Sequence, residues 1–325
     1  AQGLMALAPG LAIMLGADVG TALMARVLTL DLSWLSPLLI FLGVIFFLSR
    51  KQTRAGQLGR VGIGLGLIIL ALQLIVDEAL GAGVDHLVIV TSRTKPAIEQ
   101  YFASSPEVEA SLEKQGRGAL AEQLRRYGKD VRISFAYQDA PRGLGHAVAC
   151  AREFVGSEPF FVMLPDELMQ DSSLLTDLAT LTQNTGVGAV ALKRMPREDL
   201  FRYGIVTPVG PLTNTDGVES LPIAKVIEKP LVDDAPSDLA IIGRYALTSD
   251  IFDVLDGLVP TGTGEIQLTD ALSRQSEKTP LHGVISHIGR RDIGNPLGWI
   301  EAVIEAGLEH TEFGDGLRTW LRTVI

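Results

Sequence analysis

The sequence predicts an α/β domain of three layers, preceded by a hydrophobic segment of different composition. Strand-like apolar runs alternate with helix-like stretches from about residue 73 onward, a pattern typical of a parallel sheet with helices on both faces. The run Phe160–Asp166 begins with five apolar residues and is expected to be a strand buried on both faces. This run ends at Asp166, and ligands bind beyond the carboxyl ends of the strands in open α/β sheets.

The first half of the expected domain begins with a helix that ends at Gly83. Glycine favours this position because it adopts the left-handed conformation that closes many helices. Strands are expected where β-branched and apolar residues cluster, and helices where apolar residues recur every three to four positions. The expected helices are 76–82, 96–102, 107–127 and 174–182, and the expected strands, apart from that of Phe160, are 86–92, 131–137 and 187–192.

The second half contains shorter strands and ends in two helices. The tetrapeptide Asn214–Gly217 is typical of a hairpin tip, because its last residue tolerates positive φ. The remaining runs are assigned by the same periodicity. The expected strands are 203–207, 223–228, 239–247 and 283–288, and the expected helices are 249–255, 265–274, 296–308 and 315–322.

A glycine-containing loop follows the strand that ends near Gln138. Gly143 and Gly145 carry no Cβ, so their N–H groups can approach a base or a phosphate closely. A helix is expected to begin there. Together with the strand-end Asp166, the loop suits a nucleotide bound with Mg²⁺, although a turn and a helix cap explain the same residues.

Charge and cysteine content exclude some classes of function. The net charge is −10, but the first 76 residues carry +3 and the remainder carries −13. An acidic remainder argues against nucleic acid as the partner. The single cysteine, Cys150, excludes an internal disulfide and a cysteine-based zinc site.

Residues 1–76 have the composition of membrane-spanning segments. Leu32–Leu48 and Val61–Val76 are runs of 17 and 16 uncharged residues, separated by a basic loop. Each run lies near the lower limit for crossing a bilayer, for which about 20 residues are needed. Two such runs in succession predict membrane helices, and therefore a membrane location for this segment.

The same region resembles part of the sodium/phosphate cotransporter family. The resemblance rests on Leu15–Thr21, which matches the family's Gly-Ala-Asn-x-Gly-Thr signature except that Asp18 replaces the amide, and on the run Gly64–Val76. An interrupted helix of this kind is a plausible ion or phosphate site. Only a few of the family's spans are present, so we expect this segment to be insufficient for transport.

From about residue 73 to the end, the chain resembles bacterial UTP–glucose-1-phosphate uridylyltransferases. No segment is diagnostic alone, but eight occur in the family's order. They are Val76–Gly83, Gly143–Ala147, Leu164–Asp166, Tyr203–Val206, Glu228–Pro230, Pro236–Tyr245, Glu265–Asp270 and Asp292–Gly298. The resemblance implies a Rossmann-like nucleotidyltransferase fold and transfer of a uridylyl group from UTP to glucose 1-phosphate, giving UDP-glucose and pyrophosphate.

The resemblance also assigns the nucleotide and metal residues. Gln138 would contact the uracil edge, Gly143 and Gly145 would lie against base and ribose, and His146 is a weaker candidate for the nucleotide site. Asp166 would bind Mg²⁺, which prefers carboxylate oxygens and water. The attacking phosphate oxygen is already anionic, so catalysis needs positioning and charge neutralisation rather than a general base.

The sugar-phosphate site is assigned in the same way. Gly204, Glu228 and Gly243 would line the glucose pocket, and Glu228 can accept hydrogen bonds from two neighbouring hydroxyls. Lys229 would supply a positive charge to the sugar phosphate and act in catalysis. Asp292 is a candidate for the second metal ligand or for organising the phosphate site. A solvated surface pair is the alternative explanation of Glu228 and Lys229.

The chain departs from the family at its start, where the first β-strand, a glycine-rich phosphate-binding loop and a Pro-Lys-Glu segment are expected. The transporter-like segment stands in their place, and the two patterns meet at Leu72–Val76. Two neighbouring strands are therefore expected to lack their shared partner, and transferase activity is expected to be absent or very low.

Two other functions stay open from the sequence. One is a fragment of a sodium-dependent phosphate transporter with an incidental soluble tail, and the other is a membrane-tethered module that binds UDP-glucose without turnover. The enzyme family is cytoplasmic, whereas a span over Val61–Val76 would place the domain across the membrane from the basic loop. Whether the chain forms a homo-oligomer also stays open.

Overall fold

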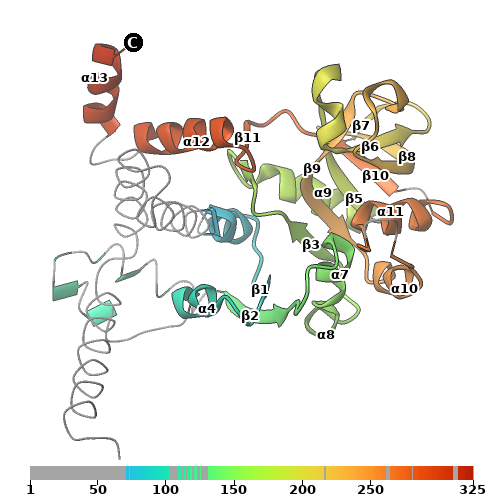
Figure 1. Ribbon diagram of the computed structural model, residues 1–325, viewed down its shortest axis with the longest axis horizontal. Helices are drawn as coiled ribbons and strands as arrows, with labels where there is room; N and C mark the ends of the chain where they lie inside the picture. The colour runs from blue at the N-terminus through green and yellow to red at the C-terminus, as the bar shows by residue number, and fades with distance from the viewer. Residues whose placement is uncertain are drawn as a thin grey trace, which may run out of the picture. The chain divides into compact units, whose positions relative to one another are not determined.

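The computed structural model describes residues 71–72, 74–102, 131–215, 217–260, 264–279, 281–309 and 314–324, and scattered residues between 109 and 125. The chain divides into two compact units, one formed by Ala1–Leu70 with Ala97–Arg132 and the other by Ala71–Pro96 with Ile133–Ile325. Within the described residues, the strands labelled in Figure 1 belong to the second unit, apart from Arg132.

The strands lie close to the predicted positions, with three short additions. β9, for example, spans the nine predicted residues, all of which are buried. The short strands β4, β7 and β11 are not predicted by the sequence pattern. The strands are β1 (His86–Thr91), β2 (Arg132–Tyr137), β3 (Phe160–Met163), β4 (Glu167–Met169), β5 (Ala189–Arg194), β6 (Gly204–Pro208), β7 (Thr213–Thr215), β8 (Val218–Glu228), β9 (Leu239–Leu247), β10 (Leu281–Ile285) and β11 (Arg290–Asp292).

The described helices lie near the predicted ones, whereas the predicted helix 107–127 falls largely outside the described residues. The first helical stretch, residues 74–81, is followed by Gly83 with φ of 80°, as expected of a helix-closing glycine. The labelled helices are α4 (Pro96–Phe102), α7 (Leu144–Ala149), α8 (Arg152–Val155), α9 (Ser173–Thr185), α10 (Ile251–Asp256), α11 (Leu268–Ser276), α12 (Pro296–Glu309) and α13 (Gly314–Val324), with 3₁₀ turns η1 (Arg197–Arg202) and η2 (Val232–Asp234).

The main sheet corrects the prediction of parallel strands. Its order is β10-β5-β9-β6-β8-β7, with β3 paired to β9. Among the described strand pairs of this sheet, only β10 and β5 run parallel. Strands joined by a tight turn must run antiparallel, as β7 and β8 do across the predicted hairpin tip. There Gly217 has φ of 86° and donates its N–H to Asn214 Oδ1 at 3.2 Å.

In the described part of the chain, β1 and β3 belong to different sheets. Within the described part of the chain, β1 is hydrogen-bonded to β2 alone, and β3 to β9 alone. The Gln138 N–H donates to the Thr91 carbonyl at 2.8 Å, which extends the β1–β2 pair to the beginning of the glycine loop. That two neighbouring strands lack a shared partner stays a prediction, because residues 1–70 lie outside the described part of the chain.

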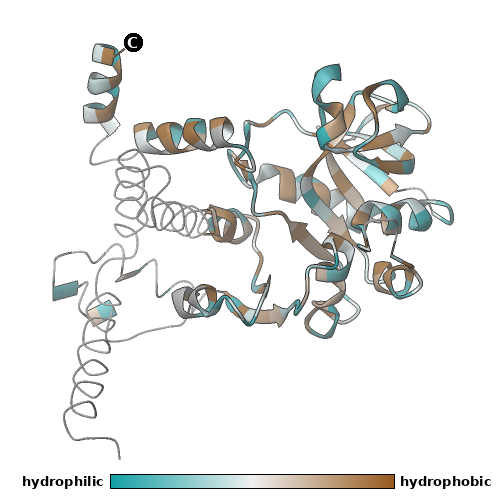
Figure 2. Cartoon of the chain, viewed as in Figure 1, coloured by the Kyte–Doolittle hydropathy of each residue, from teal (hydrophilic) through white to brown (hydrophobic). Residues whose placement is uncertain are grey.

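Two hydrophobic clusters cover the two faces of the main sheet, so the domain has the predicted three layers. Successive side chains of β5 belong alternately to the two clusters, because successive side chains of a strand point to opposite faces of the sheet. Val190 and Leu192 pack with α7, α10 and α11, whereas Ala189 and Ala191 pack with α9. Figure 2 shows the hydrophobic residues gathered along β3, β9 and α9.

The predicted membrane segment lies almost entirely outside the described residues. Of residues 1–76, the structure describes only 71, 72 and 74–76. In the part of the chain that it does describe, no helix combines the length and the apolar character needed to cross a bilayer.

Candidate functional site

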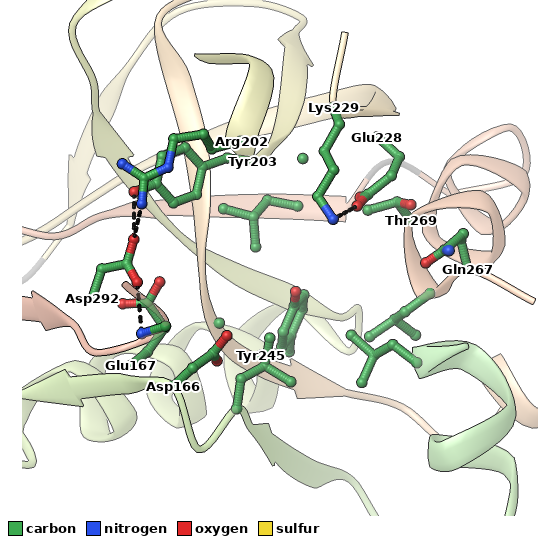
Figure 3. Close-up of a pocket in the computed structure, with 17 residues that line it drawn as sticks. Asp166, Glu167, Arg202, Tyr203, Glu228, Lys229, Tyr245, Gln267, Thr269 and Asp292 are labelled. Carbon is green, nitrogen blue, oxygen red and sulfur yellow. Dashed lines mark hydrogen bonds and ion pairs between the residues drawn. The ribbon is translucent and has the colours of Figure 1, made fainter. Parts of the chain in front are cut away.

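A cavity of about 350 Å³ lies in the second unit and brings together most of the predicted site residues. Figure 3 shows Glu228 and Lys229 on one side, with Asp166 and Asp292 facing them from the other. The cavity is lined by Leu144, Leu164, Asp166, Glu167, Arg202, Tyr203, Gly204, Glu228, Lys229, Ile241, Gly243, Tyr245, Gln267, Leu268, Thr269, Asp292 and Gly294.

Asp166 lies on the turn between β3 and β4, which packs directly on a bulge of β9. The register of β9 against β5 shifts between Ile241 and Tyr245, and Gly243 occupies this bulge with φ of 70°. A Cβ on Gly243 would lie 2.9 Å from the Glu167 Cγ. The turn can therefore approach β9 closely only because residue 243 is glycine.

Asp292 reaches Asp166 through the pairing of β4 and β11. Asp292 lies opposite Glu167 in the register, and the Ile293 N–H donates to the Asp166 carbonyl at 2.8 Å. A Cβ on Gly294 would lie 3.2 Å from Asp292 Oδ1 and 3.5 Å from Asp166 Oδ2. Oxygens of both carboxylates therefore lie beside the same glycine.

This pair of carboxylates fits the ligand preferences of Mg²⁺. Magnesium is commonly held by one or two carboxylates, with substrate phosphates and water completing its shell. Among the described residues, no group of three or more Asp, Glu, His or Cys side chains could hold a metal alone. Asp166 and Asp292 would therefore form a partial site that needs ligands from a bound phosphate.

Asp292 is oriented by three donors. Its Oδ2 accepts hydrogen bonds from Arg202 Nη2 at 2.9 Å and from the Tyr203 hydroxyl at 3.1 Å. Its Oδ1 accepts the Gly294 N–H at 3.0 Å. These contacts fix the orientation of the carboxylate, and its remaining lone pairs are available to a metal.

A buried ion pair fastens β4 to β11 beneath the two aspartates. Arg290 donates from Nε and Nη2 to the two oxygens of Glu167, at 2.5 and 2.6 Å, and lies over the Tyr203 ring at 5.1 Å. Burial raises the pKa of Glu167 to about 7, although the hydrogen bonds from Arg290 oppose this shift. This fork-to-carboxylate geometry holds the two short strands in register.

Glu228 and Lys229 come from the end of β8, opposite the beginning of β6. Gly204 pairs with Glu228 in the register, and a Cβ on Gly204 would lie 3.0 Å from Thr269 Cγ2. Lys229 has φ of 44°, the one positive value among the described non-glycine residues. Such a conformation is costly for a lysine and is characteristic of functional sites. The Lys229 Nζ lies 3.4 Å from Glu228 Oε1.

The glycine loop contributes Leu144 to the cavity, whereas Gln138, Gly143, Gly145 and His146 are not among its lining residues. The structure gives both glycines a packing role, because added Cβ atoms would lie 2.6 and 2.9 Å from the Ile266 carbonyl oxygen. The Gly145 N–H donates to that oxygen at 2.9 Å. Contacts of these residues with a nucleotide stay predictions.

The Gln138 amide is held by its own loop. Its Nε2 donates to the Gly143 carbonyl at 3.1 Å and lies 3.0 Å from His146 Nδ1, which accepts when the imidazole proton is on Nε2. Both amide hydrogens are thereby directed into the loop. The Oε1 atom is then the part of Gln138 suited to contact a ligand.

Sequence reasoning missed the residues that support the acidic pair. Tyr203 begins the recognised segment Tyr203–Val206, Arg202 precedes it, and Arg290 precedes Asp292 by two positions, so proximity to predicted site residues is the available signal. Gln267, which the sequence does not assign to function or to packing, lines the cavity and donates to Glu265 Oε2 at 2.7 Å. Arg244, which the sequence likewise does not assign, is completely buried.

With this geometry established, comparison with known proteins identifies the family. The nucleotidyl transferase family model matches residues 70–307. The chain belongs to the nucleotidyl transferase family. Annotated relatives include UTP–glucose-1-phosphate uridylyltransferases of Bacillus subtilis, 36% identical over 255 residues, and of Streptococcus pneumoniae, 36% identical over 255 residues. These matches cover 78% and 77% of this chain, and 86% and 84% of the relatives.

Solved structures give the same assignment for this nucleotidyl transferase. The UTP-bound UGPase from Acinetobacter baumannii superposes with a TM-score of 0.69 at 32% identity, covering 77% of this chain and 87% of that one. A UDP-glucose pyrophosphorylase complexed with UDP-glucose superposes with a TM-score of 0.63 at 33% identity, covering 71% and 84%. The expected nucleotidyltransferase α/β fold and the expected family are thereby confirmed.

The N-terminal resemblance is confirmed as well. The Na⁺/Pi-cotransporter family model matches residues 1–77 of this nucleotidyl transferase. The two family models overlap at residues 70–77, which include the stretch Leu72–Val76 where the sequence patterns were predicted to meet.

Proposed function

We propose that the chain is a nucleotidyltransferase for UTP and glucose 1-phosphate whose turnover is strongly reduced. The observation that carries this proposal is the single cavity that presents Glu228 and Lys229 opposite Asp166 and Asp292. A sugar phosphate needs hydrogen-bond acceptors for its hydroxyls and a positive charge for its phosphate, and a nucleoside triphosphate needs a metal. The named activity of relatives 36% identical to this chain supports the same substrates.

In this proposal, the glucose ring lies over Gly204 with two hydroxyls donating to the Glu228 carboxylate. The absence of a side chain at Gly204 leaves room for the ring next to β6. Lys229 reaches the sugar phosphate from its left-handed backbone position. Its ammonium group, 63% exposed at the side chain, can leave Glu228 and bind phosphate without a large desolvation cost.

The opposite side of the cavity would hold Mg²⁺ between Asp166 and Asp292. When bound, this metal would neutralise charge on the phosphates that react. The exposed Asp166 is accessible to an incoming metal, and Asp292 is fixed by Arg202, Tyr203 and Gly294. Two carboxylates held in place beside each other suit a site whose remaining ligands come from substrate.

The base would be recognised through Gln138 Oε1. Because both Gln138 amide hydrogens face Gly143 and His146, this oxygen can accept the N3–H of uracil. Cytosine has no hydrogen at N3, so it would leave the acceptor unpaired. The loop geometry therefore supports a preference for UTP over CTP.

Reduced turnover follows from what stands in place of the family's first strand and phosphate-binding loop. In the described part of the chain, β1 pairs with β2 and β3 pairs with β9, so no described strand connects β1 to β3. Loss of one donor to the reacting phosphate costs about 10²–10³ in rate. We therefore expect a rate at least about 100-fold below the 1–10³ s⁻¹ that is typical of enzymes.

The test is pyrophosphate release by the purified full chain with UTP, glucose 1-phosphate and Mg²⁺, together with the shift in melting temperature caused by UDP-glucose. Slow release that needs both substrates and Mg²⁺, with a UDP-glucose shift, would support the proposal. Release at an ordinary rate would contradict the reduced turnover, and a shift without release would favour a binding module. No shift and no release would refute the substrate assignment.

Fractionation of cells that produce the full chain tests the membrane association expected of residues 1–76. The support for that association is the Na⁺/Pi-cotransporter match to residues 1–77. Recovery of the chain in the membrane fraction is the expected result, and recovery in the soluble fraction would contradict it.

A further inference from the structure

The largest completely buried side chain of the described domain is a charged one, Arg244. It lies in β9 directly after the bulge at Gly243, and its exposed fraction is 0%. A buried guanidinium is strongly destabilising unless its charge is paired and its donors are used. Glu78, whose side chain is 6% exposed, supplies the charge by accepting from Arg244 Nε at 2.9 Å and from Nη2 at 2.6 Å.

The remaining donors of Arg244 go to the turn that carries Asp166. Nη1 donates to the carbonyls of Leu164 at 3.0 Å and Gly243 at 3.3 Å, and Nη2 donates to the carbonyl of Glu167 at 2.7 Å. All five N–H groups of the guanidinium are therefore used. Two of them hold the carbonyls of Leu164 and Glu167, the residues that begin and end the Asp166 turn.

We propose that Arg244 is the positioning residue for Asp166 and that Glu78 sets the place of Arg244. Fixing the two ends of a four-residue turn leaves Asp166 little freedom, so its carboxylate stays directed into the cavity beside Asp292 (Figure 3). Glu78 belongs to the helical residues 74–81 and follows directly after residues 70–77, which both family models match. The first helix of the domain is thereby part of the support of the site.

This inference rests on the proposed role of Asp166 as a metal ligand, so its test measures metal binding directly. Mn²⁺ replaces Mg²⁺ as the probe, and the free Mn²⁺ signal is followed by electron paramagnetic resonance with the purified full chain and UDP-glucose, whose phosphates supply the ligands that the two aspartates lack. Binding that disappears in Asp166→Asn defines the site. Arg244→Lys keeps the positive charge for Glu78 but cannot reproduce the planar fork that reaches both carbonyls.

The expected result is Mn²⁺ affinity reduced about 10-fold or more in Arg244→Lys, with a cooperative melting transition retained. Arg152→Lys is the matched control, because Arg152 pairs with Asp253 and Asp256 on the surface, and it should bind Mn²⁺ like the wild type. Loss in both Asp166→Asn and Arg244→Lys supports the inference. Loss in Asp166→Asn alone overturns the positioning role but leaves the proposed function, and no loss in Asp166→Asn overturns both.

Hydrogen exchange of the wild-type chain gives a second test that does not depend on folding of a variant. The Leu164 N–H donates to the Gly243 carbonyl, and the Ile293 N–H donates to Asp166. If Arg244 holds the turn rigidly, both amides should exchange as slowly as the core amides of β9. Exchange about 100-fold faster than in β9 would show local opening of the turn and would overturn the inference.

Discussion

Substitution of Gly243 by alanine tests how closely the Asp166 turn depends on the bulge of β9. An added Cβ would lie 2.9 Å from Glu167 Cγ and 3.1 Å from Leu164 Cβ, nearer than carbon atoms normally approach. The residue also has φ of 70°, which an alanine adopts only with strain. Two separate costs therefore act at one position.

A second glycine separates these two costs. Gly186 closes α9 with φ of 71°, and no atom lies within 4 Å of the position that its Cβ would take. Gly186→Ala should therefore show the backbone strain alone, about 1 kcal/mol. Gly243→Ala should add about 1–3 kcal/mol for overpacking, so its total should reach about 2–4 kcal/mol.

The assay is urea denaturation of the full chain and both variants, with the free energies of unfolding compared at equal m-values. Each kcal/mol should lower the melting temperature by about 2–4 °C in a domain of this size. Gly243→Ala should also weaken Mn²⁺ binding, because the turn must move to relieve the contact. Equal destabilisation of the two variants, within about 0.5 kcal/mol, would show that the turn relaxes freely and would refute the reasoning.

Three further predictions concern the site and the sheet. The free energy of unfolding of Lys229→Gly should be about 1 kcal/mol higher than that of Lys229→Ala, because only glycine relieves the strain of the positive φ. Both variants should lose turnover. Equal denaturation midpoints would show that the backbone at residue 229 is not strained. Asp166→Asn should lower turnover about 10²-fold or more and leave the melting temperature unchanged. The control Asp233→Asn, at a side chain that is 95% exposed, should change neither turnover nor melting temperature. Unchanged turnover in Asp166→Asn would exclude a catalytic role for Asp166. Burial lowers the pKa of the His282 imidazole below its ordinary 6.5. The contribution of the neutral ring to stability should therefore be complete above pH 6.5 and should decrease as the pH falls below 6.5. For a part-buried ring, the free energy of unfolding should fall by less than about 1 kcal/mol per pH unit. Replacing His282 by asparagine should remove that part of the slope of unfolding free energy against pH, and an unchanged slope would show that the ring is protonated equally in both states.

The sequence predicts elements well where a segment is apolar throughout or strongly periodic. β9 was placed at its observed bounds because every one of its residues is buried. α12 was predicted over 296–308 and spans Pro296–Glu309. The direction of the strands was wrong, because apolar runs alternating with helices do not distinguish a mainly antiparallel sheet from a parallel one. Pairing direction depends on connections that periodicity does not report.

The sequence likewise predicts one part of the candidate site and misses another. Asp166, Gly204, Glu228, Lys229, Gly243 and Asp292 were predicted and line one cavity. The strands that bring the aspartates together were not predicted, since β4 and β11 have three residues each, and β11 consists of charged residues. A strand of that length carries no periodicity, and its existence depends on the Glu167–Arg290 ion pair rather than on apolar burial.

The supporting ion pairs could not be predicted from the sequence because their partners lie far apart along the chain. Glu78 and Arg244 are separated by 166 positions, and Glu167 and Arg290 by 123. Ligand-facing residues are detectable because they occur at strand ends and at glycines, where the local sequence is unusual. A residue such as Glu78, in an ordinary helix, has no local signature, so only the folded chain identifies it as part of the support for Asp166.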